Sequence, residues 1–225
     1  AYHNDRENYI FDDFTIESSF DEDKVRTITI NSPDIIEGKI VGKYLFAQLP
    51  RMVENAAGSL YANYTPNKVK PGQYLRFNFT VYNKIVGIFL PEVEIGTNTA
   101  VRGLINSDNN EFKMSFNSPN IKAFDNYIDK IKLNIDNKNP LYNTYVEMDS
   151  IKTKMYKISE FSLINVTAND TLFARSEFKG GNQGQDNFNL NFFHTIEKNN
   201  KNVLGFKKSD GKFKGFTWFI NENET

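Results

Sequence analysis

The feature that most constrains this chain is a strict alternation of apolar and polar residues that recurs along its length. Successive side chains of a β-strand point to opposite faces of a sheet, so each alternating run has one apolar and one polar face. The pattern therefore predicts half-buried strands of an antiparallel sheet, because buried parallel strands read as continuous apolar runs. The clearest runs occupy residues 26–30, 75–81, 111–116, 130–136, 187–193 and 216–220.

Short polar segments rich in Asn, Asp and Gly separate these runs, for example at residues 106–111, 179–187 and 208–212. Such links between alternating strands predict hairpins and a meander. We therefore expect a mainly β fold, a long antiparallel meander, as one β-rich segment over residues 1–225. Two architectures satisfy the pattern: a sheet that curls into an open groove, and a β-sandwich that closes its apolar faces on each other.

One segment departs from the period of two and predicts an amphipathic helix near residues 50–62. Pro50 suits the first helical position, and Pro66 follows the expected end. We expect the helix to pack on the sheet or to close one end of it. The apolar residues that form its stripe are Met52, Val53, Ala56, Ala57, Leu60, Tyr61 and Tyr64.

The tripeptide Asn-Ser-Pro follows an alternating run twice, at residues 31–33 and 117–119. Proline has no N–H to donate to a neighbouring strand, and the residue before it is held in extended geometry. The repeat therefore predicts that a strand ends or bends at both positions.

The composition speaks against several classes of function. The formal net charge is −1, whereas a nucleic-acid-binding domain usually carries a basic stripe. Cysteine is absent and only His3 and His194 are present, so thiolate metal sites and histidine-based catalysis have few candidate residues. No nucleotide-binding, hydrolase or metalloprotease motif occurs, and no run of about 18 apolar residues is found. We expect no enzyme activity, no cofactor and no metal. Since the first residues show no signal peptide, the chain is expected to be cytoplasmic, mature or cut from a longer protein.

Several stretches resemble the TamB family of translocation and assembly proteins, in the form found in Bacteroidota such as flavobacteria. The resemblance runs over roughly residues 10–221. It is carried by "INSPDIIEGKIVGKYLFAQLPRMVENAAGSLYANYTP" (30–66), "IDNKNPLYNTYVEMDSIKTKMYKISEFSLINVTANDTLFARSEFKGG" (135–181), "NLNFFHTI" (189–196) and "KNVLGFKKS" (201–209).

That family belongs to the AsmA-like, bridge-like lipid-transfer proteins. Its members are very long, are anchored in the inner membrane and cross the periplasm as a curled β-sheet with an apolar interior. The resemblance implies that this chain is an internal periplasmic segment that binds and conducts phospholipid acyl chains in outer-membrane biogenesis. The implied partners are phospholipid or another acyl-chain lipid and, in the full-length protein, an Omp85-type outer-membrane partner and the inner membrane. The chain departs from the family in length, and we expect it to be an internal slice without the membrane anchor or the region that meets the Omp85-type partner.

Alternation also selects the side chains that would line such a groove. The expected groove-lining residues are Ile28, Ile30, Leu75, Phe77, Phe79, Phe112, Met114, Phe116, Ile131, Leu133, Ile135, Phe161, Leu163, Phe188, Leu190, Phe192, Phe216, Trp218 and Ile220.

Two other functions are consistent with the same pattern. An alternative is a structural β-scaffold for outer-membrane protein assembly, in which these residues form an ordinary core and no lipid binds. A third hypothesis is a carbohydrate-binding sandwich that uses tyrosines and Trp218.

Overall fold

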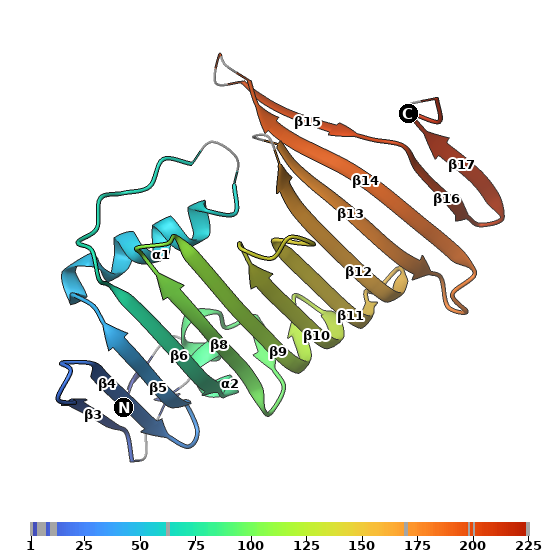
Figure 1. Ribbon diagram of the computed structural model, residues 1–225. Coiled ribbons are helices and arrows are strands. Elements are labelled where there is room, and N and C mark those ends of the chain that lie inside the picture. Colours follow the sequence, from blue (N-terminus) through green and yellow to red (C-terminus); the bar gives the residue numbers. More distant parts are fainter. Residues whose placement is uncertain are drawn as a thin grey trace.

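The chain forms one large antiparallel sheet (Figure 1). The computed structural model describes residues 2–3, 8–9, 13–61, 64–168, 171–197, 199 and 201–223. A separate two-stranded ladder joins β1 (Tyr2–His3) and β2 (Asn8–Tyr9). The strands of the large sheet are β3 (Thr15–Phe20), β4 (Arg26–Ser32), β5 (Ile36–Lys43), β6 (Tyr74–Val81), β7 (Val93–Ile95), β8 (Thr99–Asn106), β9 (Glu111–Ala123), β10 (Asn126–Asp136), β11 (Thr144–Lys152), β12 (Lys157–Ala168), β13 (Thr171–Gly180), β14 (Asp186–Ile196), β15 (Asn202–Phe206), β16 (Ser209–Phe213) and β17 (Phe216–Ile220).

The sheet is an open meander, so the expectation of a mainly β antiparallel fold is confirmed. Each strand pairs with its neighbours in the sequence, except that β7 pairs with β9 and that β15 and β16 both pair with β14. The edge strands β3 and β17 lie at opposite ends of the molecule (Figure 1). The closed β-sandwich is wrong for the described residues, because β3 to β17 form one antiparallel sheet of 15 strands that is not closed.

Two α-helices lie at opposite ends of the strands. A short 3-10 helix, η1 (Phe46–Gln48), leads into α1 (Leu49–Gly58), which has Pro50 in its first turn as predicted. The helix α2 (Asn83–Phe89), which directly follows β6, was not expected from the sequence. No helix in the described part of the chain has the length and apolar character needed to cross a membrane.

The helix α1 ends earlier than the apolar stripe suggested. The chain turns after Gly58, and the Tyr64 ring returns against that glycine: a Cβ there would lie 2.5 Å from the ring. The Tyr64 hydroxyl donates a hydrogen bond to the Asn55 side chain at 3.0 Å. Tyr64 therefore packs against the helix from outside, although its spacing placed it on the helical stripe.

The buried core lies under α1 and not along the whole sheet. Met52, which is fully buried, and Ala56 face the sheet from the helix, and they pack against Leu75, Ile105 and Phe112. The expected role of this helix is thus confirmed in structural terms: it packs on the sheet and covers one end of β6, β8 and β9.

The two Asn-Ser-Pro segments behave differently. The strand β4 ends at Ser32, as predicted, and a turn follows. The second prediction is wrong as a strand end, because β9 runs through Pro119 to Ala123. Pro119 lies where the partner of β9 changes from β8 to β7, and no strand pairing requires its missing N–H there.

Candidate functional site

All of the residues selected by alternation lie on the same face of the sheet, here called the apolar face. Residues that are paired across antiparallel strands share a face, and so do alternate residues of one strand. The pairings Ile28–Ile40, Ile40–Phe77 and Met114–Ile135 therefore fix the face of five strands, and Gly103 of β8, which opposes both Phe77 and Met114, joins the two sets. The same reasoning carries through β11 to β17, where Phe188 opposes Gly211 and Gly211 opposes Trp218.

One row of the apolar face crosses almost the whole sheet. It takes one residue from each strand between β3 and β14, with β7 left out. At a strand spacing of about 4.8 Å this row is roughly 50 Å long. Its members are Ile16, Ile30, Gly38, Phe79, Val101, Phe116, Leu133, Val146, Leu163, Ser176 and Leu190.

Aromatic rings dominate the C-terminal part of the face. The Phe178 ring stacks on Phe188 with 4.6 Å between centroids and on Phe161 at 6.0 Å. Trp218 lies 6.2 Å from Phe188 by the same measure. Gly211 makes room for the indole, because a Cβ there would lie 2.5 Å from the Trp218 ring.

Sequence reasoning missed other members of this face, among them Val101, Val146, Phe178 and Phe206. Each pairs with a selected residue or extends a row: Val101 opposes Phe116, for example, and Phe206 opposes Phe192. A signal was present in "VRGLI", "YVEM" and "ARSEF", which alternate as well but in which glycine or short polar residues replace apolar ones on the same face.

The apolar face is open over most of its area. Among the selected positions only Ile28, Leu75 and Phe112 are buried, and these lie at the end that α1 covers. The others are half-buried, apart from Phe216, which is 78% exposed at the β17 edge. A contiguous exposed apolar surface of this extent marks an interaction site in a folded protein.

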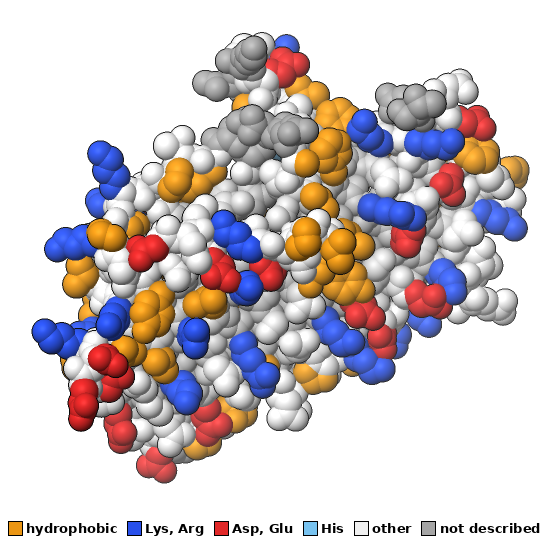
Figure 2. All heavy atoms as spheres, viewed as in Figure 1, with side chains coloured by type: hydrophobic (Ala, Val, Ile, Leu, Met, Phe, Trp, Pro, Cys, Tyr) orange, Lys and Arg blue, Asp and Glu red, His pale blue; other side chains and the backbone are white. Residues whose placement is uncertain are grey.

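The opposite face, here called the polar face, carries compensating charges over most of its area, together with an apolar group of Tyr145, Ile164, Phe173 and Phe193. Cross-strand ion pairs join Lys113 to Asp136 at 3.5 Å and Lys132 to Glu147 at 3.5 Å. Figure 2 shows Lys, Arg, Asp and Glu side chains interspersed over the molecular surface, with hydrophobic side chains gathered in the middle of the view. Exposed pairs of this kind contribute little stability, so their main effect is to keep this face hydrated.

A hollow of about 540 Å³ opens at the C-terminal end of the apolar face, lined by Met155, Tyr156, Phe188, Phe213, Lys214 and Trp218. The Tyr156 hydroxyl donates to the buried Asp186 carboxylate at 2.6 Å, and the Lys214 backbone N–H donates to the same carboxylate at 2.8 Å. Burial and this hydrogen bond raise the pKa of Tyr156 to about 12. The Asp186 carboxylate thus ties the β11–β12 turn and the β16–β17 turn around the hollow.

Among the described residues, no group of three or more His, Asp or Glu side chains is arranged to hold a metal ion. His194 forms a hydrogen bond to the Asn202 side chain at 3.1 Å across the β14–β15 pair, and His3 lies in β1. Comparisons of the chain with protein-family models, with curated proteins and with solved structures found no match.

Proposed function

We propose that this protein binds the acyl chains of phospholipid or a similar lipid on its apolar face. The observation that carries the proposal is the long row from Ile16 to Leu190 on an open sheet, whose members are partly exposed apart from the buried Ser176. An acyl chain gains about 0.8 kcal/mol for each CH₂ group that it buries. The row offers few polar partners, so it selects for long apolar chains as a class.

The continuity of the row supports conduction as well as binding. A lipid that slides from one strand to the next meets similar Phe, Ile, Leu and Val side chains and has no deep pocket to leave. This arrangement suits a segment that passes phospholipid along the periplasm between the inner and outer membranes. The resemblance to TamB proteins points the same way, and the place in the cell and the Omp85-type partner stay predictions that rest on that resemblance.

The experiment uses Trp218, the only tryptophan of the chain, which is half-buried on the apolar face. Bromine atoms on an acyl chain quench indole fluorescence on contact. We expect a phospholipid with brominated chains to quench Trp218 strongly, and its unbrominated counterpart and free bromide to quench it little. Equal signals from brominated and unbrominated lipid would refute the proposal.

A matched pair of variants assigns the binding to this face. Phe116→Asp places a charge in the middle of the row, and Ser115→Asp places the same charge one residue away on the polar face, opposite Arg102. We expect co-purified lipid, measured by extraction and mass spectrometry, to fall only in Phe116→Asp. Far-UV circular dichroism tests whether both variants are folded, and Phe116→Gln replaces Phe116→Asp if the charge prevents folding. Equal lipid content in both folded variants would place the binding elsewhere.

A second candidate is a structural or interaction role through strand addition. All six residues of the edge strand β3 are exposed, and an exposed edge can pair with an extended segment of another protein. Pairing of β3 with a peptide would be seen as protection of the Thr15–Phe20 amides from hydrogen exchange. Protection of these amides without any lipid in the purified protein would favour the scaffold role.

A further inference from the structure

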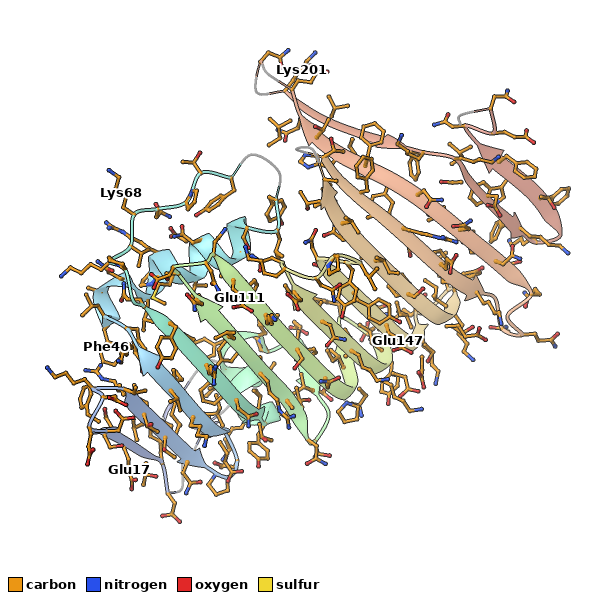
Figure 3. The ribbon with its side chains drawn as sticks, in the orientation of Figure 1. Glu17, Phe46, Lys68, Glu111, Glu147 and Lys201 are labelled. Carbon is orange, nitrogen blue, oxygen red and sulfur yellow. The ribbon has the colours of Figure 1, made fainter. Side chains whose placement is uncertain are left out.

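The guanidinium of Arg26 stands on the apolar face at its N-terminal end, next to α1. Arg26 is the residue of β4 that precedes Ile28 and Ile30 on that face. Its guanidinium carbon lies 4.7 Å from the Phe20 ring centroid and 4.5 Å from that of Phe46. Figure 3 places Phe46 at this corner, between the N-terminal strands and the helix.

The guanidinium is held by rings and not by a carboxylate. Among the described residues it forms no ion pair and donates no hydrogen bond, and its Nε–H group is buried and unsatisfied. Buried polar groups in proteins are nearly always hydrogen-bonded, so such an atom needs an explanation. Aromatic faces hold a cation in place and leave its N–H groups available for another acceptor.

A second unsatisfied donor lies beside it. Tyr44 is 8% exposed, its hydroxyl is buried without a hydrogen-bond partner, and its ring centroid lies 5.8 Å from the Arg26 guanidinium carbon. Burial raises the pKa of the Tyr44 hydroxyl, and the Arg26 charge opposes that rise, so at neutral pH this group is a protonated donor. Two side chains with unsatisfied donors, one of them charged, therefore lie next to each other at one corner of the apolar face.

We propose that Arg26 and Tyr44 bind the anionic head group of an amphiphile whose chain lies on the apolar face. This inference rests on the proposed function. A guanidinium matches the two oxygens of a carboxylate or a phosphate, and a neutral phenol donates to either. The ligand class is thus an acyl-chain lipid with an anionic head.

The open row begins about 13 Å from Arg26, taken as the four residues of β4 from Arg26 to Ile30. Ile28 lies between them and is buried beneath α1, so the acyl chain is expected to reach the row over Ile30 and Ile16. Ile16 opposes Ile30 and is 58% exposed, so an acyl chain that passes these two residues would lie on the open row. The acidic hairpin at residues 21–23 projects from the same corner, and its exposed carboxylates form no ion pair with Arg26. Because these carboxylates repel anions, we expect binding only of an anion that contacts Arg26 directly, and no general attraction of anions to this corner.

The test needs a reporter at this corner, because Trp218 lies at the far end of the sheet. Phe46 is 57% exposed and is one of the rings that hold Arg26, and tryptophan keeps an aromatic face for the guanidinium. Phe46→Trp combined with Trp218→Phe therefore moves the single indole beside Arg26. The probes are a brominated dodecanoate, its uncharged methyl ester and bromoacetate, which has the head without the chain. We expect the brominated dodecanoate to quench the indole fluorescence and to bind with an affinity at least tenfold higher than that of its ester. Bromoacetate should quench the fluorescence weakly.

Substitutions then assign the head-group contacts. In the reporter background, Arg26→Gln should lower the affinity for brominated dodecanoate about ten- to a hundredfold, to that of the ester, and Tyr44→Phe should lower it several-fold. Arg26→Lys keeps the charge but loses the planar guanidinium, so its affinity for brominated dodecanoate should lie between those of Arg26 and Arg26→Gln. Arg76→Gln, an exposed arginine on the polar face of β6, is the matched control and should change nothing.

The outcomes separate the two proposals. Equal quenching by acid and ester, unchanged by Arg26→Gln, would overturn the head-group site and leave the acyl-chain proposal standing. Absence of quenching here and at Trp218 would overturn both. Competition with unlabelled compounds identifies the source of the anion: dodecyl phosphate should displace the brominated dodecanoate, and inorganic phosphate should not. Equal displacement by both would show a site for free anions and overturn the assignment to a lipid.

Discussion

Truncating two phenylalanines of the apolar face tests directly whether that face is open. Phe112 and Phe206 both belong to it by strand register. Phe112 is 9% exposed beneath α1, whereas Phe206 is 48% exposed on β15. In a closed sandwich both rings would be core residues, and both truncations would destabilise the fold equally.

The expected free-energy changes follow from these exposures. A core phenylalanine buries about 150–250 Å² at about 25 cal/mol per Å², and truncation to alanine leaves a cavity, so Phe112→Ala should cost about 3–5 kcal/mol. Phe206 loses roughly half of that contact area, and water fills the space that its ring leaves. We expect about 1–2 kcal/mol for Phe206→Ala.

Urea unfolding measures both values, followed by far-UV circular dichroism and by Trp218 fluorescence. Agreement of the two signals establishes that the transition is two-state, and an unchanged dependence on urea allows the midpoints to be compared. Similar losses of about 3–5 kcal/mol in the two variants would show that Phe206 is covered and would refute the open face.

Three further outcomes can be checked by the same unfolding assay. Tyr44→Phe removes a buried hydroxyl without a partner, so in lipid-free protein it should raise the free energy of unfolding by about 1–3 kcal/mol. The raised pKa of Tyr156 means that the stability from its hydrogen bond to Asp186 is complete below pH 10 and is lost as pH rises from about 10 to about 12. Tyr156→Phe should not show this loss. The measurement is the urea midpoint of both proteins between pH 8 and pH 12, and a parallel loss of stability in the two would contradict the reasoning. Gly211→Val should displace the Trp218 ring, shift its emission and cost about 1–3 kcal/mol, and an unchanged emission spectrum would contradict the close packing.

Alternation in the sequence was sufficient to assign the faces of the strands. The runs around Phe77, Phe116 and Leu133 each give the correct face, because a strand's period of two is a local property. Which strand pairs with which depends on contacts between segments, and the short links between runs indicated that sequence neighbours would pair. The meander was therefore predictable.

The openness of the sheet was not predictable from the residues alone. A half-buried strand has the same alternating sequence whether its apolar face packs on a second sheet or binds a ligand. The pattern around Phe116 therefore fits both architectures. Only the TamB resemblance favoured the open form. The number of strands and their order then exclude the sandwich for the described residues.

Local exceptions escaped the sequence for identifiable reasons. The second Asn-Ser-Pro lies within β9 because β9 pairs with β8 before Pro119 and with β7 after it. The sequence around Pro119 does not reveal this change of partner. The helix α2 is only seven residues long and contains Ile85, Val86 and Ile88, which favour strands on propensity. Nothing in the sequence distinguishes Arg26 and Tyr44 from other residues, because an unsatisfied donor is recognised only when all of its neighbours are placed.

The meander makes this protein nearly one-dimensional in its energetics. Most strands contact only the strands before and after them in the chain, so the stability of the sheet is close to a sum of strand-to-strand terms. Folding can begin at any well-formed hairpin and proceed by the addition of neighbouring strands on both sides. Fraying is expected to start at the edge strands β3 and β17. A protein built this way can gain or lose hairpins during evolution without rebuilding a common core, and its length becomes an adjustable property.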